Sequence, residues 1–199
     1  DYSPAFGNGE YTEMYFTSSR TGGLTDDIDN GTGETFSDIY LTKINKKGVW
    51  SAPEVLSEPI NTKGNEGSVV LNKKGTVMYL TQCPVEKKKD LPCRIYVSKR
   101  SGRLWGNPEL VQIKLDSNTT IGHPALSEDE SMLVFSAEMP GGLGGKDLWM
   151  THKEKRNKWS NPVNLGVMVN TPGDEVFPFL HADGTIYFSS DGHIGMGGL

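Results

Sequence analysis

Three tryptophans, each followed three residues later by a proline, divide this chain of 199 residues into units of nearly equal length. They are Trp50, Trp105 and Trp159, and the intervals between them are 55 and 54 residues. Upstream of each lies a triplet similar to Asp-Ile-Tyr, and upstream of that an apolar run such as MYFTSS or LVFSAE. A sequence that repeats itself about every 50 residues builds an array of similar structural units, so the repeat constrains the fold more than composition does.

Each unit contains four short segments with the character of β-strands. In the third unit they are residues 123–127, 131–137, 147–153 and 162–167, and Gly, Asn, Asp, Ser or Pro separate them. The segments SEDES, NKKGT and HADGT have the composition of tight turns between the first and second strands. No segment has helical periodicity over three turns, so we expect no helical domain.

Four strands in a period near 50 residues are typical of a β-propeller blade. We predict an all-β fold of propeller blades, each with four antiparallel strands, and about three and a half blades in this chain. Ala5 is expected at the position that Val69, Pro124 and Phe177 hold in the later units. The predicted blades are residues 1–61, 62–117 and 118–170, with a partial blade at 171–199.

The last unit ends after its second strand, in the segment GHIGMGGL. Propellers have about four to eight blades, and no spare strands precede the first unit. We therefore expect the chain to be a fragment of a larger propeller. Open blade edges expose unpaired strands and apolar faces, so they favour self-association with another copy of the chain.

The segment PGGLGGKDLW, residues 140–149, joins the second and third strands of the third unit. Glycine readily adopts the positive φ angles of a compact turn, and Asp commonly accepts backbone N–H groups there. We assign this structural role to Asp147 and, in the first unit, to Asp38. A phosphate-binding site is the alternative, but no helix follows whose N-terminus faces an anion. In the second unit Arg94 replaces the Asp, so the turn is not a site common to all units.

Cys83 and Cys93 are the only two cysteines, in the segment CPVEKKKDLPC. Structural zinc sites use two pairs of ligands, which this spacing does not supply. Both cysteines lie between two strand-like runs, where a disulfide would close the base of a long hairpin loop. We predict this disulfide, which implies an oxidising compartment, and two free thiols are the alternative.

Over nearly its whole length the chain resembles the WD40-like PD40 propeller repeat. The resemblance rests on the run MYFTSS at residues 14–19, the glycine-rich turn before Asp147, and the segment WSNP at Trp159 with the Leu-Gly and Asn-Thr pairs after it. The Gly-Gly-x-Gly-Gly turn is similar to that of Bacteroidetes OmpA-family outer-membrane proteins, which include a propeller component of the type IX secretion machinery. The periplasmic propeller protein of the Tol-Pal system resembles the chain more distantly.

The resemblance implies a periplasmic protein associated with the outer membrane, without a cofactor. Its propeller would act as a scaffold for protein partners in a cell-envelope complex. In such proteins peptidoglycan is bound by a separate domain, which this chain lacks.

The net charge of −5 does not provide the basic face that a nucleic-acid partner requires. The longest apolar runs, such as SVVL and MLVF, are far too short to cross a bilayer. We therefore expect neither a nucleic-acid partner nor a membrane span.

One face of the predicted propeller collects the linkers between blades and the loops between second and third strands. The candidate partner-binding residues on this face are Arg20, Glu66, His123, Asp174, Glu175 and Asp191. A solvated polar rim is the alternative. The acidic segment 26–34 lacks the full ligand spacing of a calcium loop, so we expect no metal site; Asp27 and Asp29 are the only calcium candidates.

Catalytic motifs are lacking. The sequence has no HExxH zinc motif and no GxSxG nucleophile elbow. The segment SSDGHIG resembles the Asp-box of sialidase propellers, but His193 stands where that motif needs glycine. We predict a binding module without catalytic residues. The alternative is the propeller of a secreted enzyme that processes carbohydrate or peptide.

Overall fold

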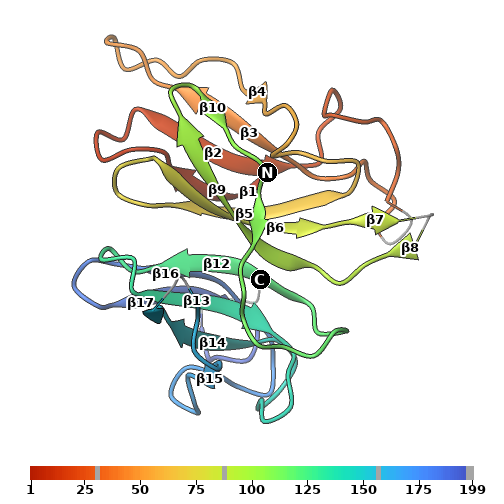
Figure 1. The fold of residues 1–199 in the computed structure, drawn as a ribbon, viewed down its shortest axis with the longest axis vertical. Coiled ribbons are helices and arrows are strands. Elements are labelled where there is room, and N and C mark those ends of the chain that lie inside the picture. Colours follow the sequence, from red (N-terminus) through yellow and green to blue (C-terminus); the bar gives the residue numbers. More distant parts are fainter. Residues whose placement is uncertain (30–31, 87–88, 156–157, 196–199) are drawn as a thin grey trace.

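The computed structural model describes residues 1–29, 32–86, 89–155 and 158–195. These residues form 17 β-strands and no α-helix, so the fold is all-β as the repeat predicts. Within the described ranges no helix is long and apolar enough to cross a membrane. The strands form antiparallel sheets that follow one another along the chain (Figure 1), as expected for successive blades of a partial propeller.

The first three sheets each contain at least four strands, and the fourth contains two. Sheet one consists of β1 (Tyr2–Phe6), β2 (Glu13–Ser18), β3 (Asp38–Lys43) and β4 (Glu54–Val55). Sheet two consists of β5 (Asn65–Leu71), β6 (Val77–Cys83), β9 (Arg94–Ser101), β10 (Leu104–Trp105) and β11 (Glu109–Leu110). Sheet three consists of β12 (Ile121–Leu126), β13 (Met132–Ala137), β14 (Asp147–His152) and β15 (Val163–Asn164). The fourth is a hairpin of β16 (Glu175–Leu180) and β17 (Ile186–Ser190).

The outer edges of the sheets are less regular than the inner strands. The fourth strand of sheet three was expected over residues 162–167, but only Val163 and Asn164 pair with β14. In sheet two, β10 and β11 are both short and both pair with β9. A further short hairpin, β7 (Val85–Glu86) with β8 (Lys89–Asp90), extends from the loop between β6 and β9.

Tight turns join the inner two strands of each unit, as their composition predicts. After β12, the backbone N–H of Glu130 donates to the carbonyl of Ser127, and the Ser127 hydroxyl accepts the N–H of Met132. Gly75 and Gly184 close the corresponding turns with φ angles of 66° and 89°. Both glycines lie in the left-handed region, which glycine adopts without strain. Glu130 holds the same position after β12 with a φ of 59°, so this turn geometry favours glycine but does not require it.

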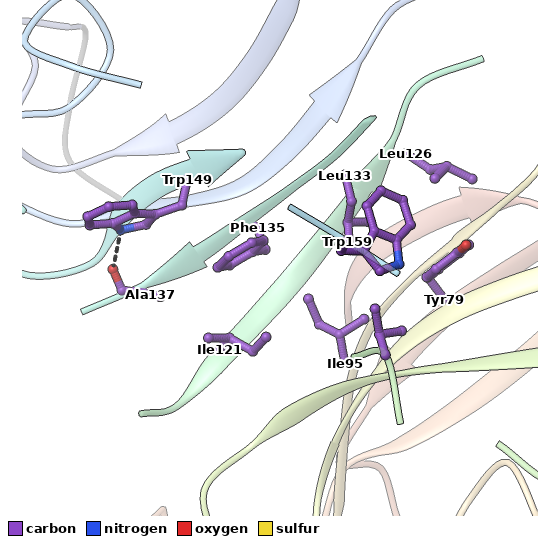
Figure 2. Close-up of a cluster of buried hydrophobic side chains, with 10 residues drawn as sticks. Tyr79, Ile95, Ile121, Leu126, Leu133, Phe135, Ala137, Trp149 and Trp159 are labelled. Carbon is purple, nitrogen blue, oxygen red and sulfur yellow. Dashed lines mark hydrogen bonds between the residues drawn. The ribbon is translucent and has the colours of Figure 1, made fainter. Parts of the chain in front are cut away.

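Three apolar clusters fill the spaces between successive sheets. Alternation along β13 shows how one strand serves two of them. Leu133 and Phe135 belong to the cluster shared with sheet two, whereas Val134 between them belongs to the cluster shared with the β16–β17 hairpin. Figure 2 shows the cluster between sheets two and three, in which Trp159 approaches Tyr79 of sheet two.

Strand pairing aligns the four units residue by residue. The residues that share one position on the inner strands are Pro4, Val69, Pro124 and Pro178. The expectation that Ala5 and Phe177 hold this position is wrong by one residue in each case. A bulge interrupts every inner strand beside this position, and a bulge shifts register without a clear signal in sequence.

The three repeat tryptophans share one register position, opposite the residue at the end of the third strand. The pairs are Trp50 with Ile44, Trp105 with Arg100 and Trp159 with Lys153. Trp159 is buried and Trp105 half-buried, but Trp50 is exposed. The exposure differs because Trp105 and Trp159 pack against the sheet that precedes their own, whereas no sheet among the described residues precedes that of Trp50.

Candidate functional site

The inner strands β1, β5, β12 and β16 lie next to one another and line a channel of about 790 Å³. Its walls are largely apolar, with Phe6, Val69, Leu126 and Phe179 among the lining residues. A second cavity, of about 440 Å³, is lined by residues that include Lys114, Trp149 and Pro162. Ligand sites are usually large, mostly apolar concavities with a few polar groups, so the channel is the candidate functional site.

The bulge of each inner strand faces this channel. The position just before the shared proline site is held by Ser3, Ser68, His123 and Phe177. Three of these have positive φ angles, 54° at Ser3, 53° at His123 and 52° at Phe177. Such angles are strained for residues other than glycine, and strain of this kind is concentrated at functional sites. Bulges also re-aim side chains, here toward the channel.

Three rings from different sheets meet at these bulges. The rings of His123 and Phe177 stack with centroids 4.1 Å apart and an interplanar angle of 23°. Tyr2 meets Phe177 edge-on, with centroids 5.9 Å apart. The backbone N–H of Phe177 donates to Nδ1 of His123 at 3.5 Å. We call Tyr2, His123 and Phe177 the channel aromatic cluster.

His123 is uncharged near neutral pH. Burial, together with the smaller effect of the positive charge of Lys146, lowers its pKa to about 4. A neutral imidazole suits the geometry, because Nδ1 must be unprotonated to accept the N–H of Phe177. The channel aromatic cluster therefore offers an uncharged aromatic surface, which suits an apolar or aromatic group of a ligand better than an ion.

Carboxylates are scarce along the channel. Among the described lining residues Glu128 is the only acidic one, and its carboxylate forms an ion pair with Lys73 at the surface. Glycoside hydrolysis ordinarily needs two carboxyl groups about 5 to 10 Å apart across the scissile bond. The described walls of the channel supply no such pair.

Four of the six residues predicted for a partner-binding face lie at the surface or in the channel. His123 belongs to the channel aromatic cluster. The Arg20 guanidinium lies 5.1 Å from the ring centroids of both Phe16 and Tyr40, and it forms an ion pair with Asp1. The other two, Asp174 and Asp191, form a short chain of contacts: Asp174 accepts the N–H of Lys146, and Asp191 accepts the N–H of Asp174, each at 2.7 Å.

Glu66 and Glu175, the last two of the six predicted residues, do not lie on the predicted partner-binding face, because both are fully buried. Each carboxylate accepts both the backbone N–H and the hydroxyl of a threonine four residues earlier, Thr62 and Thr171. Burial raises the pKa of Glu66 to about 8, although the Thr62 hydrogen bonds lower it. These glutamates fasten the linkers between sheets and are not available to a partner.

The surroundings of the two calcium candidates, Asp27 and Asp29, differ from those of a metal site. Asp27 is exposed, and the Asp29 carboxylate accepts a hydrogen bond from Asn65 at 2.7 Å. Within residues 1–29, 32–86, 89–155 and 158–195, no group of three or more His, Cys, Asp or Glu residues could hold a metal ion. Residues 30–31 of the acidic segment lie outside the described residues, as do residues 196–199 of the segment GHIGMGGL.

Two kinds of closure hold the loops between second and third strands. In sheets one and three the buried Asp38 and Asp147 accept the backbone N–H groups of Leu24 and Leu143, each at 2.7 Å. In sheet two, Cys83 and Cys93 form the predicted disulfide, with Cα atoms 4.0 Å apart. Strand pairing places Cys93 at the position just before the third strand, next to the Arg94 that replaces the Asp.

The sequence interpretation missed Tyr2 and Phe177 as channel residues. A signal for them was present, since the inner strands contain the related segments SPAF, HPAL and FPFL. In each segment the residue before proline is the one at the bulge with a positive φ angle. Proline ordinarily confines the residue before it to extended backbone with a negative φ, so the positive angles come from the bulge, and the recurring X-Pro pair only marks where the bulge lies.

No protein-family model and no curated protein matches the sequence. Solved structures do. TolB from Acinetobacter baumannii is similar with a TM-score of 0.60 and 18% identity, over 98% of this chain and 38% of that one. An α-L-arabinofuranosidase from Lactobacillus brevis has a TM-score of 0.56 and 13% identity, over 94% of this chain and 63% of that one.

A thermostable family-43 glycoside hydrolase is also similar, with a TM-score of 0.54 and 13% identity, over 90% of this chain and 62% of that one. This chain therefore spans less than two thirds of each of these proteins. Identities of 13 to 18% concern the fold alone. Together with the antiparallel four-stranded sheets, these likenesses show a β-propeller fold, with part of a propeller present.

Proposed function

We propose that this chain is a non-catalytic binding module of the cell envelope, which engages a protein partner through the channel and the face around Arg20, Asp174 and Asp191. The observation that carries the proposal is the character of the channel: strained aromatic residues and a neutral histidine line it, and no carboxylate pair does. Aromatic anchors in concave sites are characteristic of protein recognition.

The compartment follows from the disulfide. Disulfides persist in oxidising compartments and are rare in the cytosol, so Cys83–Cys93 supports a location outside the cytoplasm. The PD40-like repeat and the likeness to TolB support a periplasmic scaffold. Association with the outer membrane, participation in type IX secretion, and peptidoglycan binding by a further domain belong to the same proposal and rest on the sequence resemblance.

A carbohydrate-processing enzyme is the second candidate function, because two of the similar structures are an arabinofuranosidase and a family-43 glycoside hydrolase. The channel of this chain argues against it. Its single described acid, Glu128, is paired with Lys73 at the surface and lacks a second carboxylate across the channel.

A capture experiment tests the binding proposal. The immobilised chain is exposed to solubilised cell envelope from its source, and bound proteins are identified by mass spectrometry. We expect one envelope protein to be retained by the wild type and by Leu104→Ala, which alters an exposed residue away from the channel, but lost with His123→Asn. Asn is chosen because it tolerates a positive φ angle better than most residues.

The competing activity is tested on the same preparations. Hydrolysis of a chromogenic arabinofuranoside by the wild type would overturn the proposal, as would retention of the same proteins by His123→Asn and wild type. Circular dichroism verifies that the variants are folded before either comparison is made.

A further inference from the structure

One polar side chain of the channel has no role in the fold. Ser68 lines the channel at the bulge of β5 and is only 3% exposed, yet its hydroxyl oxygen has no hydrogen-bond partner among the described residues. Buried hydroxyl groups are ordinarily hydrogen-bonded, because a buried group without a partner loses the hydrogen bonds that it makes to water. The hydroxyl turns about a single bond, so a polar group that enters the channel beside Ser68 can become its partner.

The imidazole of His123 supplies a second polar group to the channel. Its position is fixed by the stack on Phe177 and by its own backbone N–H, which donates to Oγ1 of Thr81 at 3.2 Å. Nδ1 accepts the backbone N–H of Phe177, so the proton of the neutral ring is on Nε2. In the described part of the chain no hydrogen bond joins Nε2 to another residue. His123 therefore offers one N–H donor to a ligand.

The backbone offers no donor at the bulges of sheets three and four. The N–H groups of His123 and Phe177 are both engaged, and each residue is followed by a proline, Pro124 or Pro178, which has no N–H. Proline on an edge strand also hinders the pairing of a further strand with that edge. We therefore expect a ligand to be recognised here by side chains rather than by extension of the inner strands β12 and β16.

Charge limits the kind of ligand that the channel can accept. Among the described lining residues the only Lys, Arg, Asp or Glu side chains are Lys73 and Glu128, which pair with each other. A charged group that enters beside the neutral His123 would lose its hydration without gaining a partner. A peptide unit fits better, because its carbonyl accepts from an N–H donor and a serine hydroxyl can bond to either its carbonyl or its N–H.

We propose that Ser68, His123 and Phe177, which we call the channel subsite, bind an uncharged peptide segment of the protein partner that carries an aromatic side chain. The aromatic ring packs against the stacked rings of His123 and Phe177, where aromatic pairs are favourable. The peptide carbonyl beside it accepts the Nε2–H of His123, and the Ser68 hydroxyl bonds to the next peptide group. This inference rests on the proposed function, since it names the part of the partner that the channel receives.

NMR of the histidine rings, labelled with nitrogen-15, tests the channel subsite directly. Long-range proton–nitrogen spectra near neutral pH are expected to show the proton of His123 on Nε2, and the signal is assigned as the one that His123→Asn lacks. Addition of the blocked peptide acetyl-Ala-Phe-Ala-amide is expected to shift the Nε2 signal until it saturates. Peptides with Asp or Lys in place of Phe are expected to bind more weakly by more than about tenfold.

Several results of this titration would overturn the proposal. They are a proton on Nδ1 of His123, a Phe peptide that leaves the Nε2 signal unchanged, and charged peptides that bind as well as the Phe peptide. Methyl α-L-arabinofuranoside is the carbohydrate probe, and a shift caused by this sugar but not by the peptide would assign the subsite to the wrong class of ligand.

Two serine variants separate binding from folding. Ser68→Ala is expected to weaken binding of the Phe peptide about threefold to tenfold without lowering stability, because the hydroxyl makes no hydrogen bond in the described fold. Ser98→Ala is the matched control, since Ser98 is also buried but its hydroxyl donates to the carbonyl of Gly106 at 2.7 Å. The control is expected to lose stability and to keep its affinity for the peptide. Unchanged affinity in Ser68→Ala would mean that the hydroxyl serves a water only, and the proposal would fail.

Failure of this inference is distinguishable from failure of the proposed function. If an envelope protein is captured in a manner that depends on His123 but the Phe peptide does not bind, the binding module stands and the channel subsite is wrong. If the peptide binds and no envelope protein is captured, the channel subsite stands and the proposed function is wrong.

Discussion

Oδ2 of Asp147 accepts the backbone N–H of Leu143 at 2.7 Å, and this hydrogen bond closes the glycine-rich turn between β13 and β14. The turn passes so close to the carboxylate that a Cβ on Gly142 would lie 2.2 Å from Oδ2. Asp38 makes the same bond to Leu24 in sheet one, where a Cβ on Gly23 would lie 2.1 Å from its Oδ2. At Gly142 and Gly23 glycine is therefore required because a Cβ has no space there, and not because of the backbone angle.

Gly142→Ala is expected to lower the free energy of unfolding by about 2 to 4 kcal/mol, since the methyl group displaces the buried Asp147 carboxylate from the backbone N–H of Leu143. Gly141→Ala is the matched control. Gly141 has a φ of 89° but nothing within 4 Å of a Cβ, so the cost there is only backbone strain, about 1 kcal/mol. Urea denaturation measures both, and equal losses would contradict the steric explanation.

The double variant Cys83→Ser, Cys93→Ser is expected to lose about 3 kcal/mol of unfolding free energy, because the disulfide restricts a short loop in the unfolded chain. Denaturation with and without reductant provides the check. Reductant should destabilise the wild type by a similar amount and leave the double variant unchanged. A wild type insensitive to reductant would show that the loop is held by other contacts.

Replacement of the repeat tryptophans is expected to have unequal effects on stability. Trp159→Ala removes a buried ring that contacts Tyr79 and should cost about 3 to 5 kcal/mol. Trp50→Ala removes an exposed ring at the same register position and should cost less than about 1 kcal/mol. The comparison is made by thermal and urea unfolding at a protein concentration too low for association. Similar costs would mean that Trp50 contributes as much packing energy to the fold as the buried Trp159 does.

Glu66→Gln is expected to change the pH dependence of stability. The pKa of Glu66 is raised from 4.5 to about 8 in the folded protein, so between these values the folded state binds more protons than the unfolded state. Its contribution is therefore fully present below pH 4.5 and is lost as the pH rises through about 8. Gln is uncharged at every pH and still accepts from Thr62.

The measurement is the difference in unfolding free energy between Glu66→Gln and wild type across this window. It should shift in favour of the variant as the pH rises, by an amount on the order of a few kcal/mol. A difference that does not vary with pH would mean that Glu66 is ionised in the fold throughout. Because the comparison is a difference, the opposing titration of His123, whose pKa is lowered, cancels from it.

The features that the sequence predicted are those that leave a periodic or pairwise trace. The spacing of Trp50, Trp105 and Trp159 predicted the repeat and hence the all-β propeller fold, and the two cysteines predicted the disulfide. Both signals depend only on residue type and on the interval between residues, which can be read directly from the sequence.

The channel was not predictable in the same way. It depends on bulges that bring Tyr2, His123 and Phe177 together from three different sheets, and a bulge changes register without changing the alternation of residue types elsewhere. For Glu66 and Glu175 the sequence prediction of an exposed position was wrong. Charge predicted exposure for them, but two hydrogen bonds from a threonine allow each carboxyl to be buried.

Closing the sheet-two loop with a covalent bond has a consequence for how freely that loop can vary. In sheets one and three the turn must keep a glycine against its Asp carboxylate, so Gly23 and Gly142 limit which sequences the loops can accept. In sheet two the Cys83–Cys93 crosslink holds the two strand ends together in place of an Asp carboxylate. Substitutions in the described part of this segment are therefore expected to cost less in folding than substitutions at Gly23 or Gly142, because a covalent bond does not depend on the size of a neighbouring side chain.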